Sequence, residues 1–281
     1  MKLNLTAGGS SGGEGSLLGS HGSIIGIGTD IAGSIRIPAY CNGAYGFKPT
    51  VGRIPNAGQK NVGRDGMAGI QYCTGPLAQS VNDLRLVLES FVDNIAWEDD
   101  AIAAAIPWRR LEFNPQKKLR LGLILEDKNF PIHPTVMRTL TTAAKLLEQA
   151  GHEVISINDQ IPSIDDLTLT AWKFFALDSA KTEMTRLIAY GEPIIKSLAN
   201  CRFPELDDYK GTLEELYDLN IERARVTEAF NKVVKSNKLD AALMPIYQSV
   251  AAPHDDYGLG TYTVPANFFD VWTCAPQFRT I

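Results

Sequence analysis

The chain contains few cysteines and histidines, and none of them is paired. Four cysteines occur in 281 residues, at positions 41, 73, 201 and 274. They form no CxxC pair, which argues against a disulfide framework and a zinc site and favours a reducing compartment such as the cytoplasm. The four histidines, at positions 21, 133, 152 and 254, show no HxxxH spacing. We therefore expect no metal site and no cofactor.

Long apolar runs and an excess of positive charge are also missing. No stretch approaches the roughly 18 uninterrupted apolar residues that a membrane helix needs. The segment from Met1 to Leu5 is too short for the apolar core of a secretory signal. The net charge is −5 and the lysines and arginines are scattered. We expect neither a nucleic-acid partner nor a membrane partner.

No internal repeat, heptad pattern or low-complexity linker divides the chain. Its apolar fraction of 44% and charged fraction of 21% are ordinary for a globular protein. We therefore predict a single α/β domain over residues 1–281. Nothing in the sequence indicates an oligomeric state.

A βαβ unit is predicted in the middle of the chain. The apolar segment LRLGLILE at 119–126 is typical of a strand. Pro134 begins a helix that Gly151 ends, and EVISI at 153–157 is the next strand. Two strands joined by one helix run parallel.

Other periodic segments predict helices. Apolar residues recur at steps of three and four from Leu77 to Phe91, with Ser80 as N-cap and Asp83 as its capping partner. Residues 167–198 are predicted helical with a break at 191–193, and residues 212–235 form the most helical stretch. LDAALMPIY, at 239–247, is predicted as a buried strand.

Residues 8–58 are rich in glycine, and two of their serine sites have very small neighbours. Ser10 and Ser11 lie in GGSSGG, and Ser34 lies in GTDIAGSIRIP. Small neighbours allow sharp turns and a close approach of backbone N–H groups to a ligand. The backbone over residues 31–34 is therefore a candidate oxyanion hole beside a hydroxyl nucleophile.

The residues alone leave the chemistry of this stretch open. A serine nucleophile needs a base, and His21 is the nearest histidine, with no acid arranged behind it. GGSSGGEGS lacks the GKS or GKT of a phosphate-binding loop, and GIGTDIAG lacks the GxGxxG order of a dinucleotide site. A flexible linker is the remaining interpretation of the glycine-rich stretch.

A longer match favours one chemistry. The segment GGSSGGEGSLLGSHGSIIGIGTDIAGSIRIPAYCNGAYGFKPTVGRIP, together with GPLAQSVNDL and PHDDYG further on, resembles the amidase signature family. The similarity is greatest to its fungal acetamidase-like and general amidase-like branch. The resemblance implies a mixed, largely parallel central β-sheet flanked by helices, with the signature region at about 8–58.

The resemblance also implies an activity, namely hydrolysis of a small-molecule carboxamide through an acyl-enzyme. Ser34 would be the nucleophile, and Ser10, preceded by a cis peptide bond, would relay a proton. The backbone of Ile31, Ala32, Gly33 and Ser34 would form the oxyanion hole. Asp30, Arg36 and Ser11 would support the loop, and His21 would be a surface or structural residue.

The third member of the family's triad, a lysine, lies upstream of the GGSSGG loop. Lys2 is the lysine that precedes Ser10 in this sequence, and a base lysine must be held and desolvated. We therefore do not assign that role to Lys2. Both ends of the fold are expected to be incomplete. A non-catalytic amidase remnant, or a truncated gene product, is the alternative to an active hydrolase.

Overall fold

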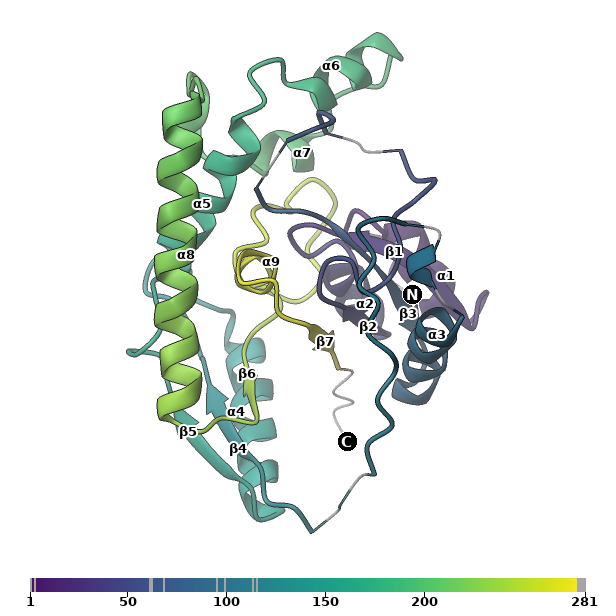
Figure 1. Cartoon of the computed structure of the whole chain (residues 1–281), viewed down its shortest axis with the longest axis vertical. Helices are drawn as coiled ribbons and strands as arrows, with labels where there is room; N and C mark the ends of the chain where they lie inside the picture. The colour runs from purple at the N-terminus through teal and green to yellow at the C-terminus, as the bar shows by residue number, and fades with distance from the viewer. Residues whose placement is uncertain are drawn as a thin grey trace.

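Two β-sheets, one antiparallel and one parallel, organise the chain (Figure 1). The computed structural model describes residues 2, 4–60, 63–67, 69–94, 96–98, 100–112, 114 and 116–276. In the antiparallel sheet the order is β1 (Ile25–Asp30), β3 (Cys73–Ala78), β2 (Tyr45–Lys48) and β7 (Thr273–Ala275). In the parallel sheet it is β5 (Glu153–Ser156), β4 (Arg120–Leu123) and β6 (Ala241–Leu243).

The predicted α/β class is confirmed, and the parallel pairing is found in the predicted βαβ unit. β4 and β5 are parallel, with Leu121 opposite Val154. The helix between them, α4 (Pro134–Gln149), has Pro134 at its first position. Gly151 follows the helix end with a φ of +90°, a conformation that glycine adopts without steric cost. These are the local residues from which the unit was predicted.

The strands around the glycine-rich region differ from a simple parallel sheet. β1 and β2 are joined through α2 (Arg36–Asn42) and both pair antiparallel with β3. β1 and β2 therefore run in the same direction, as a helical crossover requires, and β3 lies between them. The insertion of β3 makes this sheet antiparallel, which the sequence did not predict.

The helices agree with the periodic segments, with one added break. Residues 167–198 fall in α5 (Ile164–Ala176), α6 (Thr182–Ala189) and α7 (Lys196–Asn200). The predicted break at 191–193 separates α6 from α7, and a second break separates α5 from α6. The predicted helix 212–235 is α8 (Leu213–Ser236), with a capping box between Thr212 and Glu215. None of the described helices is both long enough and apolar enough to span a bilayer.

The prediction of a buried strand over 239–247 is wrong in extent and in burial. Only Ala241–Leu243 form β6, and both alanines are exposed while Leu243 is half-buried. β6 is an edge strand of the three-stranded sheet. An edge strand is not covered by a neighbour on one side, so an apolar composition alone does not ensure burial.

Ser80 caps α3 (Val81–Asp93) as predicted, because its Oγ accepts a hydrogen bond of 3.2 Å from the N–H of Asp83. Substitution Ser80→Ala removes this bond, and we expect unfolding free energy to fall by about 1 kcal/mol in urea denaturation. Ser90→Ala, an exposed position within the same helix, is the matched control. Equal stability of the two variants would contradict the capping role.

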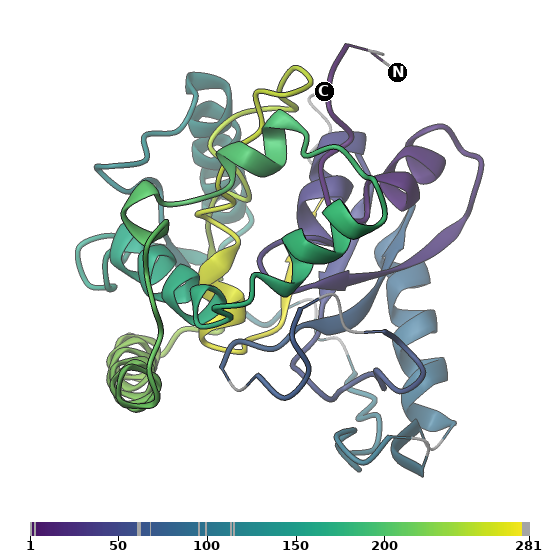
Figure 2. The ribbon, with the colours of Figure 1, turned by 90° about the horizontal axis from the view of Figure 1, so that it is seen from above.

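The small helix α9 (Val264–Phe268) connects the two halves of the fold (Figures 1 and 2). It lies between α2 on one side and α5 and α8 on the other, and it contributes to an apolar cluster. The buried members of this cluster are Ile70, Leu167, Ala171, Phe174, Leu219, Val226, Val264 and Phe268. Ile31 and Ala32 pack against the cluster, so the segment before Ser34 contacts residues that are distant in the sequence.

Candidate active site

The two serine loops that the sequence singles out lie against each other. The N–H of Ser11 donates to the carbonyl oxygen of Ser34 at 3.1 Å. The Gly9–Ser10 peptide bond is cis. Asn42 of α2 donates to the carbonyl oxygen of Ala7 at 2.8 Å and ties the first loop to the helix that follows Ser34. Ser10 is exposed and Ser34 is half-buried.

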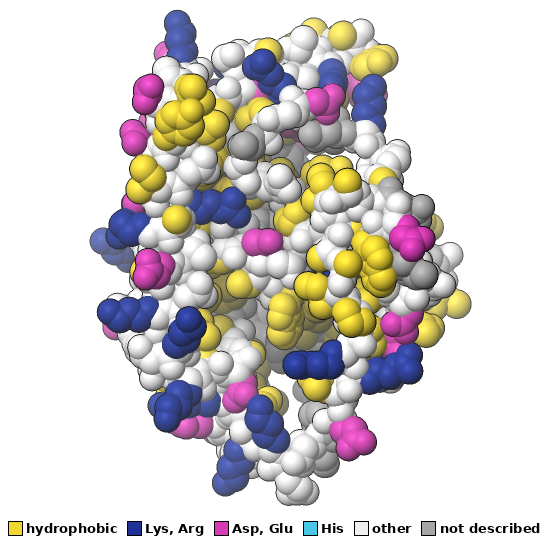
Figure 3. Space-filling view, in the orientation of Figure 1, with side chains coloured by type: hydrophobic (Ala, Val, Ile, Leu, Met, Phe, Trp, Pro, Cys, Tyr) yellow, Lys and Arg dark blue, Asp and Glu magenta, His cyan; other side chains and the backbone are white. Residues whose placement is uncertain are grey.

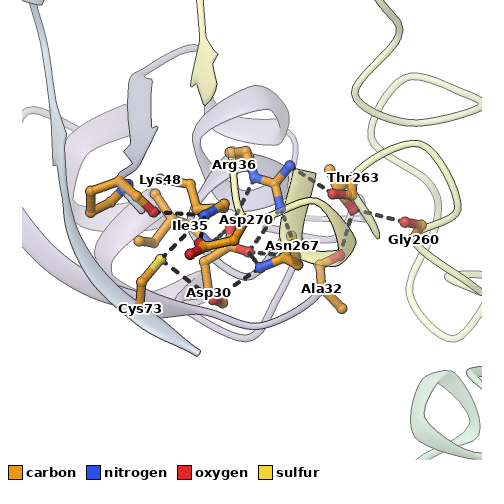
Figure 4. A network of polar contacts seen from close by, with 12 residues as sticks. Asp30, Ala32, Ile35, Arg36, Lys48, Cys73, Gly260, Thr263, Asn267 and Asp270 are labelled. Carbon is orange, nitrogen blue, oxygen red and sulfur yellow. Dashed lines mark hydrogen bonds and ion pairs between the residues drawn. The ribbon is translucent and has the colours of Figure 1, made fainter. Parts of the chain in front are cut away.

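Asp30, at the end of β1, holds the turn that carries Ser34. Its carboxylate is fully buried and accepts the backbone N–H groups of Gly33 (2.8 Å) and Ile35 (3.1 Å). Arg36, the first residue of α2, pairs with the same carboxylate through Nε (3.0 Å) and Nη2 (2.8 Å) (Figure 4). Asp30 and Arg36, predicted as supporting residues, therefore lie in direct contact.

Two residues that the sequence analysis missed complete this buried network. Asn267 of α9 accepts from Arg36 Nη2 at 2.6 Å and donates to Asp30 Oδ1 at 3.0 Å. The carbonyl oxygen of Thr263, just before α9, accepts from Arg36 Nη1 at 2.8 Å (Figure 4). A polar residue inside the apolar run TVPANFF is the one local indication of Asn267, since buried polar groups require partners.

The pKa of Asp30 reflects this network. Burial acts to raise it, but the positive charge of Arg36 and hydrogen bonds from Arg36, Asn267 and the Ile35 N–H outweigh burial and lower the pKa to about 2. The carboxylate is therefore ionised over the whole neutral range. Its negative charge compensates the positive charge of Arg36, and both side chains are buried.

This lowered pKa predicts an acid-dependent loss of stability. Because the folded pKa of about 2 lies below the ordinary value of 3.8, the stabilisation is present above pH 4 and is lost between about pH 4 and 2. The loss amounts to about 2 kcal/mol. Between about pH 4 and 2, the free energy of unfolding measured in urea should depend less on pH in Asp30→Asn than in the parent. An equal pH dependence in the two proteins would contradict the role of the Asp30 carboxylate.

Hydrogen bonds to its carbonyl oxygens hold the backbone between Asp30 and Ser34. The carbonyl oxygen of Asp30 accepts from Asn267 Nδ2 at 3.2 Å and from the Cys73 thiol at 3.6 Å. Burial raises the pKa of Cys73 to about 12, so the thiol retains its proton. The carbonyl oxygen of Gly33 accepts from the N–H of Ile37 at 2.8 Å.

These contacts leave three neighbouring N–H groups free to bind an anion. In a trans peptide the C=O and N–H groups point in opposite directions. The carbonyl groups of Asp30 and Gly33 are fixed by their hydrogen-bond donors. The N–H groups of the same peptides, those of Ile31 and Ser34, therefore point away from these donors. Among the described residues, the N–H groups of Ile31, Ala32 and Ser34 have no hydrogen-bond partner.

Gly33 differs from the other residues predicted for the oxyanion hole. Its N–H already donates to Asp30, so its contribution is to the shape of the turn. Its φ is +128°, and a Cβ at this position would collide with the hydroxyl of Thr263 and the side chain of Ile37. Only glycine fits both the conformation and the space.

The other sequence candidates lie apart from this network. His21 is exposed in the turn after α1 (Gly12–Gly19), in agreement with a surface residue. The hydroxyl of Ser11 lies against Gly28 of β1, where no Cβ would fit. Lys2 is exposed. Within the described ranges no cluster of three or more His, Cys, Asp or Glu residues is placed to hold a metal ion.

Lys48 is a buried cation beside this network that the sequence analysis did not single out. Its Nζ donates to the carbonyl oxygen of Pro49 at 2.6 Å and lies 3.7 Å from the carboxylate of Asp270 (Figure 4). Asp270 also accepts from the N–H of Val51 at 2.9 Å. Lys48 and Asp270 thus join β2 to the segment between α9 and β7.

Charged groups elsewhere on the molecule are mixed in sign. On the face shown in Figure 3, basic and acidic side chains are interspersed, including along α8 at the left. Such a distribution gives no continuous field of one sign on this face.

Known proteins are similar to this chain in sequence and in fold. The chain is 35% identical over 272 residues to a protein named Amidase from Gibberella moniliformis, covering 96% of this chain and 50% of that protein. It is 33% identical to an Acetamidase of Aspergillus oryzae, covering 95% of this chain and 50% of the relative. The solved structure of a fatty acid amide hydrolase matches with a TM-score of 0.89 at 29% identity, over 97% of this chain and 48% of the other.

The chain thus spans about half the length of the curated relatives that it matches. A family model described as Amidase matches residues 1–278, which include both serine loops and α9. Because this match extends over nearly the whole sequence, the chain belongs to the amidase signature family.

Proposed function

We propose that this protein hydrolyses the C–N bond of a small carboxamide through an acyl-enzyme at Ser34. The observation that carries the proposal is a set of N–H groups, at Ile31, Ala32 and Ser34, that have no partner among the described residues and lie on a turn held by a buried ion pair. Such groups are suited to the negative charge that develops on a carbonyl oxygen. Membership of the amidase family supports the same reaction.

In the proposed reaction, the hydroxyl oxygen of Ser34 attacks the amide carbon, and its proton passes to the relay serine, Ser10, which supplies a proton to the leaving nitrogen. The carbonyl oxygen becomes negatively charged and binds to the free N–H groups. When the tetrahedral intermediate collapses, the C–N bond breaks and the nitrogen leaves with a proton as ammonia or an amine. Water then attacks the ester on Ser34 and releases the carboxylic acid.

Ser10 is proposed as the proton relay between Ser34 and a base. The bond from the Ser11 N–H to the Ser34 carbonyl, at 3.1 Å, supports this role because it holds the two loops together. Ser11 is proposed to stabilise the first loop. Lys2 is exposed and is not proposed as the base, since a lysine acts as a base when it is buried and its pKa is lowered.

The proposal is tested by incubating the purified chain with a panel of small aliphatic, aryl and fatty amides and measuring the released ammonia or amine. We expect hydrolysis of at least one amide, at a rate proportional to enzyme concentration. Absence of hydrolysis across the panel would favour the alternative, a non-catalytic amidase remnant.

A further inference from the structure

Thr263 lies where it can control the geometry of the turn that carries Ser34. Its buried hydroxyl is 2.5 Å from the carbonyl oxygen of Ala32, which is 231 positions earlier in the chain (Figure 4). We propose that Thr263 is a positioning residue for the hydrolysis, because its hydroxyl orients the Ala32–Gly33 peptide and thereby the free N–H groups beside it. The inference rests on the proposed function.

The carbonyl oxygen of Ala32 depends on this hydroxyl. Thr263 Oγ1 also lies 2.8 Å from the carbonyl oxygen of Gly260, and a hydroxyl has a single proton to donate. The Gly260 oxygen accepts, in addition, the N–H groups of Thr263 (3.1 Å) and Val264 (3.3 Å). Among the described residues, Ala32 O has no other donor. Loss of the hydroxyl therefore affects Ala32 rather than Gly260.

The Ala32–Gly33 peptide is held at both of its polar ends. Its C=O accepts from Thr263, and its N–H donates to Asp30 Oδ1 at 2.8 Å. A peptide with both groups bonded cannot rotate about its long axis without breaking one of them. The two adjoining peptides carry the free N–H groups of Ala32 and Ser34, so their directions depend on this central peptide.

Thr263 is better suited to a test than Asn267. The Asn267 side chain contacts both Asp30 and Arg36, so its substitution also disturbs the buried ion pair. The bond from Arg36 to Thr263 is made to the backbone carbonyl and does not depend on the side chain. Substitution of threonine by valine keeps a branched side chain beside Gly33 and replaces the hydroxyl with a methyl group, which cannot donate a hydrogen bond.

The experiment compares Thr263→Val with Thr263→Ser, which retains the hydroxyl, in the 281-residue chain. Hydrogen–deuterium exchange at the Gly33 amide reports whether the peptide is held. Labelling of Ser34 by a fluorophosphonate and the kcat and KM for an amide report whether the oxyanion hole is correctly oriented. Thr263→Ala replaces the valine variant if that variant does not fold.

We expect exchange at Gly33 to rise by about tenfold in Thr263→Val and to stay near the parent rate in Thr263→Ser. Labelling and kcat should fall by about tenfold or more in Thr263→Val, with KM nearly unchanged, since a misdirected oxyanion donor affects the transition state. In Thr263→Ser, the labelling rate and kcat should stay near the parent values.

Exchange and labelling rates in Thr263→Val within about twofold of the parent would overturn the inference. An equal loss in Thr263→Ser and Thr263→Val would also overturn it, because the hydroxyl would then not be the active feature. If the parent chain is neither labelled nor active, the proposed function fails instead. Exchange at Gly33 then decides separately whether Thr263 holds the turn.

Discussion

Substitution Ser34→Ala should abolish labelling by a fluorophosphonate and lower amide hydrolysis by at least about a thousandfold. In the proposed mechanism Ser34 supplies the oxygen that forms the acyl-enzyme, and it lies in the turn that leads into α2. The fold should be unaffected, because Ser34 joins the first loop through its backbone carbonyl and not through its side chain. Mass spectrometry of the labelled protein locates the modified residue.

Ser20→Ala is the matched control for this prediction. Ser20 is an exposed serine of the same glycine-rich region, and its hydroxyl donates to carbonyl groups of the preceding helix. The Ser20→Ala variant should be labelled, and should hydrolyse amides, at the parent rate. Equal activity of Ser34→Ala and Ser20→Ala would remove Ser34 as the nucleophile, and labelling of a different serine would reassign the site.

Substitution Arg36→Met should lower the free energy of unfolding by about 3–5 kcal/mol, because it leaves the Asp30 carboxylate buried without its counter-charge. The same change removes the donors to the Thr263 carbonyl and to the Asn267 side chain. α9 would thus lose its contacts with Arg36 and, among its described polar contacts with the turn of Ser34, keep only the hydrogen bonds from Asn267 to Asp30. Urea denaturation measures the loss of stability, and circular dichroism shows whether the variant folds.

Arg225→Met is the control for the loss of an arginine as such. Arg225 pairs with Glu222 on the exposed surface of α8 at 2.6 Å. Exposed pairs are screened by solvent and contribute little to stability. Similar stability of the two variants would contradict the view that the Asp30–Arg36 pair is the polar centre of the site.

Local features of the fold could be predicted because the residues that decide them are close in sequence. Ser80 and Asp83 mark the start of α3, and Pro134 and Gly151 bracket α4. The pairing of strands could not be predicted in the same way. The position of β3 between β1 and β2, and the exposure of β6 at an edge, depend on neighbours brought together by folding.

The same distinction applies to the candidate site. Ser10, Asp30, Ser34 and Arg36 lie within 27 consecutive residues, and the motif that contains them could be recognised as a unit. Thr263 and Asn267 could not, because their partners are more than 220 positions away: Arg36 is 227 positions from Thr263, and Asp30 is 237 from Asn267.

The sequence by itself determined the family, the βαβ unit and the serines proposed for catalysis, since all of these depend on residue type and short spacing. Only the tertiary structure decided which N–H groups near Ser34 are free. That outcome depends on carbonyl groups held by Cys73, Thr263 and Asn267. These side chains reach the turn because β3 and α9 pack against it, and such packing over long separations is not written in any local pattern.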